Sequence, residues 1–267
     1  MGQRKGFVGG SRALVILLVL LHGFTLALLI LKSSAGQWGH AALCILCLAL
    51  YSLPALLGLV FRASLPPLLY GIAACFAAAA NLGGEVFGLY LQLPFWDASL
   101  HFLWGLLAAV IGYSMPDLLG RREGVSRSMP KAAAVLLSVS FAMLIAVLWE
   151  FVEFAVDLWF HTDMQKDCWI NCVYSVLLQP DGLNQAQKVE FAGVLVNGDP
   201  WPAFLDVGLR DTMSDLLWTF AGTIPGAALV LTDYRGSGSS RILRSLLPKP
   251  KPNKAKDGAK RHEPEKP

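Results

Sequence analysis

Residues 13–31 read ALVILLVLLHGFTLALLIL, and this stretch contains no Asp, Glu, Lys or Arg. Two further stretches, residues 41–61 and 63–84, share this property over 21 and 22 positions. Each is close to the length of about 20 apolar residues that a helix needs to cross a bilayer. We therefore predict that the chain crosses a membrane several times.

The composition of the 267-residue chain supports a membrane protein. Hydrophobic residues make up 55% of it and charged residues only 15%, whereas soluble domains average about 25% charged residues. This excludes an ordinary soluble enzyme. The sequence also contains no Gly-rich phosphate loop, Ser-His-Asp signature or nucleic-acid motif, so no nucleic-acid partner is expected.

Three more apolar runs, at residues 98–115, 132–160 and 216–232, bring the predicted number of membrane spans to six. The predicted fold is an all-α polytopic helix bundle over residues 1–234. The first run could instead be a signal peptide, because Arg4, Lys5 and Arg12 precede it. Its 19 residues exceed the usual 7 to 15 of a signal peptide, which favours a retained helix.

The distribution of Lys and Arg predicts the orientation of the spans. If the N-terminus is cytoplasmic, 18 of the 22 basic residues fall on the inner side and four on the outer side. Positive charge accumulates on the cytoplasmic side of membrane proteins. We therefore predict a multi-pass protein of the bacterial inner membrane with both termini in the cytoplasm.

Two segments are predicted to lie outside the bilayer. The outward-facing loop of residues 161–210 is apolar around residues 168–178, so it either caps a site near the membrane surface or is a passive surface loop. Residues 199–202 are predicted to form a turn, and the spacing of Cys168 and Cys172 leaves open whether they form a disulfide. Residues 235–267 carry ten basic and three acidic residues. We predict a disordered cytoplasmic tail that anionic lipid could attract or that serves only to set the topology.

Ionisable side chains at the ends of three spans form pairs with helical spacing. The pairs are Asp97 with His101, Glu150 with Glu153, and Asp211 with Asp215. Residues three or four positions apart lie on one face of a helix. With a rise of about 1.5 Å per residue, every pair lies about 21 to 31 Å from the inner end of its helix. All three pairs, with Glu85 as a further candidate, are therefore predicted near the outer face.

This acidic group needs positive charge, because neighbouring carboxylates in a low-dielectric setting raise one another's pKa. The six apolar runs contain no Lys or Arg, so the counter-charge is either protons or metal. Helix bundles use one imidazole with several carboxylates to bind one or two divalent ions. We predict Zn, Mg, Mn or Ca. The predicted ligands are Asp97, His101, Glu150, Glu153 and Asp215.

The predicted chemistry is a hydrolase or transferase reaction on a lipid head group, with Glu153 and Asp211 as catalytic residues. A metal can polarise a phosphoryl or carbonyl oxygen and lower the pKa of water, which leaves a carboxylate to act as base. Two alternatives remain open at this point. Paired intramembrane acids also suit a cation or proton pathway, and a polar network could simply fix helix packing.

The order of these motifs resembles that of a known family. The motifs are Trp96-Asp97-x-x-x-His101-Phe102-x-x-Gly105, then Glu150-x-x-Glu153, then Asp211-Thr212-x-x-Asp215-Leu216 with Gly222. They resemble the YjdF-like bacterial inner-membrane proteins and, more distantly, the VanZ-like proteins. The chain departs from the VanZ-like pattern in having Glu153 where Gln is usual and Thr219 where Asn is usual. The resemblance implies a cell-envelope protein with a polar core of these residues.

Overall fold

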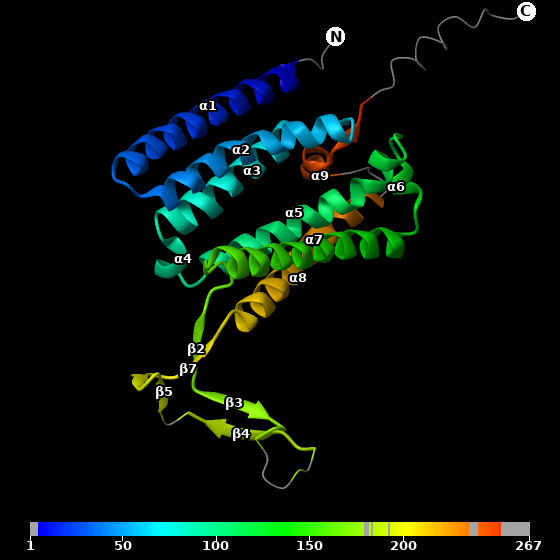
Figure 1. Ribbon diagram of the computed structural model, residues 1–267. Helices are drawn as coiled ribbons and strands as arrows, with labels where there is room; N and C mark the ends of the chain where they lie inside the picture. Colours follow the sequence, from blue (N-terminus) through cyan, green and yellow to red (C-terminus); the bar gives the residue numbers. More distant parts are fainter. Residues whose placement is uncertain (1–4, 179–181, 183, 192, 235–239, 252–267) are drawn as a thin grey trace, which may run out of the picture. The chain divides into compact units, whose positions relative to one another are not determined.

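A computed structural model describes residues 5–178, 182, 184–191, 193–234 and 240–251 (Figure 1). The chain divides into two compact units. Unit 1 comprises residues 1–143 and 219–267, and unit 2 comprises residues 144–218.

The six predicted spans are confirmed as helices long and apolar enough to cross a membrane. They are α1 (Lys5–Ser34), α2 (Trp38–Val60), α3 (Pro67–Ala78) with the π-helix η1 (Ala79–Val86), α5 (Trp96–Leu119), α7 (Lys131–Phe160), and α8 (Leu209–Leu231) with the 3₁₀ helix η2 (Thr232–Tyr234). Short helices are α4 (Leu89–Gln92), α6 (Val125–Ser128) and α9 (Arg241–Leu246). The third span begins at Pro67 and not near residue 63, because proline suits the first helical position and Pro66 is extended.

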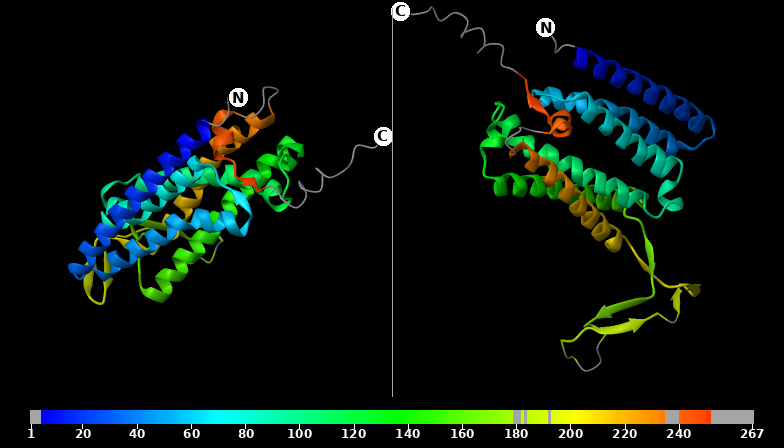
Figure 2. Two further views of the ribbon diagram at one scale, coloured as in Figure 1. Left: turned by 90° about the horizontal axis from the view of Figure 1, so that it is seen from above. Right: turned by 180° about the vertical axis from the view of Figure 1, so that it is seen from behind.

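Helices α1, α2 and α3 pack side by side in unit 1 (Figure 1 and Figure 2). Their shared core is built from buried residues of α2, α3 and η1: Cys44, Cys47, Tyr51, Ala74, Ala77, Leu82 and Val86. The hydroxyl of Thr25 in α1 lies 3.0 Å from that of Tyr51. In α1, the side chains of Val19 and Leu20 are exposed, as expected for side chains that contact lipid.

Glycines bring the backbone of α5 against that of α8 in unit 1. A Cβ at Gly105 would lie 2.0 Å from the carbonyl oxygen of Thr219, and one at Gly222 would lie 1.9 Å from that of Phe102. Small residues allow membrane helices to approach this closely. Gly105 and Gly222 are therefore close-packing points between the two helices.

A buried carboxylate joins three elements at the other end of these helices. The hydroxyl of Tyr113 in α5 donates to Asp233 Oδ2 at 2.8 Å, and the guanidinium of Arg127 in α6 pairs with Asp233 Oδ1. The Tyr234 hydroxyl donates to the carbonyl oxygen of Ser126 at 2.9 Å. We refer to Tyr113, Arg127 and Asp233 as the Asp233 clamp.

The prediction of disorder from residue 235 onward is wrong for residues 240–251, while 235–239 and 252–267 lie outside the described residues. Ser240 caps α9 by accepting the Leu243 N–H at 3.0 Å. Leu243 and Leu246 are buried against Leu69, Leu107 and Val110 of α3 and α5. The short strand β8 (Lys249–Pro250) pairs with β1 (Ala63–Ser64). Apolar residues at helical spacing therefore order a segment whose average composition is polar.

The loop between α7 and α8 in unit 2 forms three antiparallel strand pairs, which we call the β-arm. They are β2 (Cys168–Ile170) with β7 (Phe204–Asp206), β3 (Cys172–Ser175) with β4 (Gln187–Glu190), and β5 (Val194–Val196) with β6 (Asp199–Trp201). The predicted turn at residues 199–202 is wrong. The turn lies at Asn197 and Gly198, whose φ values of 54° and 92° suit a tight hairpin.

Hydrogen bonds connect residues 164–166, which precede the first strand of the β-arm, to helices α7 and α8. Asp157 near the end of α7 accepts the N–H groups of Met164 at 2.6 Å and Gln165 at 2.8 Å. Asp211 in α8 accepts the N–H of Lys166 at 2.8 Å. Cys168 and Cys172 both carry free thiols, and burial raises the pKa of the Cys168 thiol.

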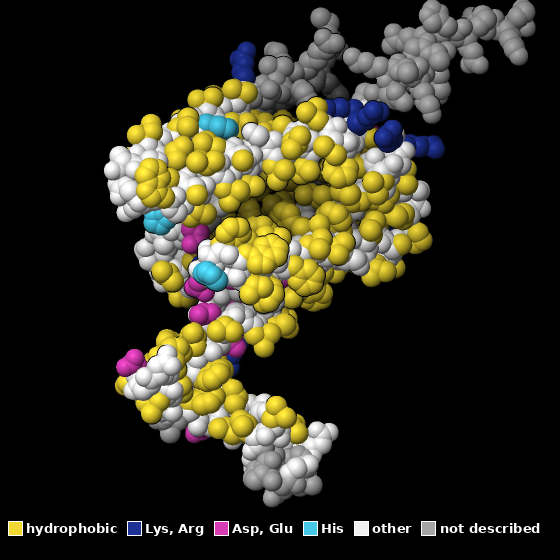
Figure 3. Space-filling view, viewed as in Figure 1, with side chains coloured by type: hydrophobic (Ala, Val, Ile, Leu, Met, Phe, Trp, Pro, Cys, Tyr) yellow, Lys and Arg dark blue, Asp and Glu magenta, His cyan; other side chains and the backbone are white. Residues whose placement is uncertain are grey.

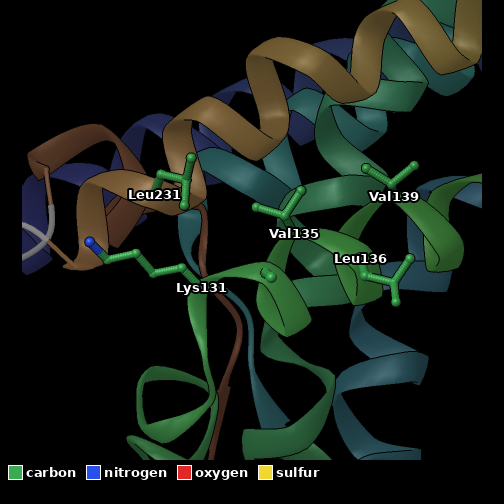
Figure 4. Close-up of a pocket in the computed structure, with 6 residues that line it drawn as sticks. Lys131, Val135, Leu136, Val139 and Leu231 are labelled. Carbon is green, nitrogen blue, oxygen red and sulfur yellow. The ribbon is translucent and has the colours of Figure 1, made fainter.

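An apolar depression of about 600 Å³ opens between the start of α7 and the end of α8 in unit 1 (Figure 4). Its lining residues are Lys131, Ala132, Val135, Leu136, Val139 and Leu231. These side chains include no carboxylate, imidazole or thiol. We therefore place the candidate chemistry elsewhere, at the acidic residues of unit 2.

Candidate metal centre

Two glutamates lie on the buried face of α7. Glu150 is 4% exposed and Glu153 is 8% exposed, whereas Trp149, Phe151 and Val152 beside them are exposed. Ala146 continues the buried face one turn earlier. The uninterrupted apolar run before Glu150 specifies the helix, and the three-residue spacing then places both carboxylates on the same side.

Asp215 of α8 completes a group of three carboxylates within unit 2. Its side chain is 3% exposed. One oxygen from each of Glu150, Glu153 and Asp215 lies within 4.8 Å of the other two. Oxygens bound to a single Mg²⁺ or Ca²⁺ ion at 2.0 to 2.6 Å are at most about 4 to 5 Å apart. The three oxygens are therefore close enough together for one divalent cation to reach them.

Glu153 has a neighbour that the sequence analysis did not identify. The indole N–H of Trp149 donates to Glu153 Oε1 at 2.7 Å. A hydrogen bond of this kind restricts the rotation of the carboxylate. The signal was the four-residue spacing of Trp149 and Glu153, because residues i and i+4 meet on one helix face.

Asp97 and His101 form a pair on α5 in unit 1, as their spacing predicts. His101 Nε2 lies 3.7 Å from Asp97 Oδ1, and the side chain of His101 is 13% exposed. The other ring nitrogen, Nδ1, lies 3.4 Å from the Thr219 hydroxyl. Thr219 beside Nδ1 can orient the ring, as an outer-shell partner does for a metal-binding histidine, whereas 3.7 Å is too long for a hydrogen bond between Nε2 and Asp97. Thr219 was missed as a partner, although it lies one helical turn after Asp215.

Asp211 and Glu85, the other two acidic residues predicted near the outer face, lie outside the group of three carboxylates. Asp211 lies one turn before Asp215 on α8, where it caps the loop backbone at Lys166, and it does not belong to the three-carboxylate group of unit 2. Glu85 lies in the π-helix η1 and is half-buried. Their participation in a site stays a prediction.

The carboxylates and the imidazole of these residues determine which ligands the candidate site could bind. Three buried carboxylates supply hard oxygen ligands, and His101, whose Nδ1 lies beside the Thr219 hydroxyl, offers one nitrogen ligand. A carboxylate that is not needed as a ligand can accept a proton. The groups could therefore bind a divalent cation or transfer protons.

Comparison with known proteins identifies a family. No curated protein and no solved structure matches the chain significantly. Residues 13–235 match the family described as "Predicted membrane protein (DUF2238)". The match covers all six spans and the β-arm. The chain therefore belongs to this family of membrane proteins.

Proposed function

We propose that Glu150, Glu153 and Asp215, together with Asp97 and His101, bind one or two divalent metal ions at the outer end of the membrane spans. On this proposal the protein is a metal-dependent hydrolase or transferase acting on a lipid head group or an envelope precursor. The observation that carries the proposal is the group of three buried carboxylates within 4.8 Å of one another.

The energetic argument starts from the mutual repulsion of these carboxylates. At separations below 5 Å, in surroundings of low dielectric constant, three ionised carboxylates repel one another strongly. Either protons or a divalent cation relieve this repulsion. A cation does so while keeping all three oxygens as ligands, and the spacing of the oxygens suits that role.

Zn²⁺, Mg²⁺, Mn²⁺ and Ca²⁺ all fit a ligand set dominated by oxygen. The imidazole of His101 favours Zn²⁺ or Mn²⁺ over Ca²⁺, because Ca²⁺ takes oxygen ligands. The Thr219 hydroxyl beside Nδ1 supports an orientation of the ring in which Nε2 is the metal ligand. His101→Ala is therefore expected to weaken metal binding in the proposed site.

The proposed reaction uses residues that the chain already positions. A bound divalent ion would polarise a phosphoryl oxygen and lower the pKa of a water molecule. Glu153 is the proposed general base, because the Trp149 N–H holds its carboxylate within the buried acidic group. Asp211 is the second proposed catalytic residue, positioned by the Lys166 N–H one turn from Asp215.

The proposed location is the inner membrane of a bacterium, with both termini in the cytoplasm and the site facing outward. The excess of Lys and Arg on one side of the spans supports this orientation. The resemblance to YjdF-like and VanZ-like proteins supports a role at the cell envelope. A lipid-like substrate would reach such a site from the bilayer itself.

A cation- or proton-coupled transporter is the second candidate function. It is favoured by the burial of Glu150 and Glu153 on one face of a membrane span, since intramembrane acids serve as relays in pumps and transporters. A network that only fixes helix packing would use the same residues without moving ions.

Elemental analysis of protein purified in mild detergent without chelator tests the proposal. The expected result is a stoichiometric divalent metal that is reduced in His101→Ala. Absence of metal together with pH-dependent ion flux in liposomes would favour transport. A protein with neither bound metal nor ion flux would indicate that the polar residues only fix helix packing.

A further inference from the structure

The β-arm carries many hydrophobic side chains that the protein itself does not cover (Figure 3). Leu177 after strand β3 is 94% exposed, and Leu195 in β5 is 72% exposed. Further exposed members are Trp169, Tyr174, Val176, Leu178, Phe204 and Val207. So many exposed apolar side chains on one small segment mark an interaction surface.

The arm is too small to bury these side chains by itself. Each of its strands has three or four residues, and they form isolated two-stranded pairs. Among the described residues between 161 and 208, only Ile170 and Ala203 are buried hydrophobics. Two-stranded pairs are marginally stable in water without a further apolar contact.

The arm is also a direct continuation of the membrane-facing surface of α7 and α8. The last residues of α7, Trp159 and Phe160, are 71% and 70% exposed, and Leu209 at the start of α8 is 68% exposed. These positions end two membrane spans, and aromatic residues there typically lie at the level of the lipid head groups. The arm therefore begins and ends at the membrane surface.

The net charge of the arm distinguishes electrostatic attraction to anionic lipid from apolar insertion into the bilayer. Residues 161–210 contain six acidic and three basic side chains, so the segment is net negative. Anionic lipid would repel it and not attract it. Apolar insertion, which does not depend on lipid charge, is the contact that this surface suits.

We infer that the β-arm docks on the lipid bilayer, with Val176, Leu177 and Leu178 entering the boundary between head groups and acyl chains. The same side chains keep the arm against the membrane next to the outer ends of α7 and α8. Lys188 and Glu190 pair at 2.6 Å on β4 and stay in water. This inference does not rest on the metal proposal, because it concerns other residues.

The test uses an environment-sensitive fluorophore on one exposed cysteine of the full chain in lipid nanodiscs, where only buried cysteines are kept besides it. Cys75, Cys168 and Cys172 are replaced by Ser, and the fully buried Cys44 and Cys47 are retained. Leu177→Cys carries the probe and Glu190→Cys is the matched control on the same arm. Both positions are exposed, so neither change removes internal packing.

The expected result is strong quenching at position 177 by spin-labelled lipid and several-fold weaker quenching there by aqueous iodide than at position 190. The pattern should be the same in zwitterionic and anionic nanodiscs and at high salt. Iodide access at 177 equal to that at 190 would overturn the inference. So would shielding from both quenchers, which would indicate a protein contact, or shielding that requires anionic lipid or high protein concentration.

Discussion

Asp233 shows, at the scale of single residues, how this chain holds one buried carboxylate. Its two oxygens are bound by the Tyr113 hydroxyl and the Arg127 guanidinium, and the hydrogen bond and charge of Asp233 raise the pKa of Arg127. The spacing rules predicted the grouping of Glu150 with Glu153, because both lie on one helix. They could not predict the Asp233 clamp, whose partners are more than 100 positions apart in the sequence.

Arg127→Ala should destabilise the protein, because it removes the guanidinium that pairs with a buried carboxylate. The expected loss is about 1–3 kcal/mol, the usual cost of removing one partner of a buried hydrogen-bonded group. Thermal unfolding in detergent measures it, with the exposed Arg122→Ala as control. Equal melting temperatures for the two variants would show that the clamp contributes nothing.

At the scale of elements, the apolar runs predicted the six spans because their length is set by bilayer thickness. The β-arm was not predicted, since strands of three or four residues leave no periodic pattern long enough to recognise. The Asn197-Gly198 turn was its strongest local signal. Helix α9 was missed because its three apolar residues lie within a segment rich in Gly, Ser, Pro and Lys.

Gly105→Ala should strongly destabilise the contact between α5 and α8. The added Cβ would lie 2.0 Å from a backbone oxygen, which cannot move as a side chain could. Overpacking of this kind costs about 1–3 kcal/mol or more. The control is Gly23→Ala, where no heavy atom lies within 4 Å. If thermal unfolding shows the same stability for both variants, the helices do not approach as described.

Leu243→Asp should release α9 from unit 1. Leu243 is fully buried, so a carboxylate there would be desolvated, whereas neighbouring Ile242 is 63% exposed. Limited trypsin digestion should cleave at Arg241 and Arg244 much faster in Leu243→Asp than in the control Ile242→Asp. Equal cleavage in the two variants would mean that α9 does not pack.

The whole molecule belongs to a family of membrane proteins, and its proposed orientation rests on the distribution of charge along the chain. A periplasmic reporter inserted near Gln185 in the β-arm should be active. A reporter fused after Lys251, beyond α9 and β8, should be inactive. The reverse pattern would place the acidic site on the cytoplasmic side and remove the argument for an envelope substrate.

The central claim is that Glu150, Glu153 and Asp215 hold a divalent cation, and the metal content of Glu150→Gln tests it most directly. Glutamine keeps the shape of the side chain but removes its charge, while it can still donate and accept hydrogen bonds as a protonated carboxyl does. The control is Glu190→Gln, a change at a glutamate that is 72% exposed. We predict stoichiometric metal in the wild type and in Glu190→Gln, and a large loss in Glu150→Gln. Wild-type metal content in folded Glu150→Gln, or no metal in any of the three proteins, would contradict the claim.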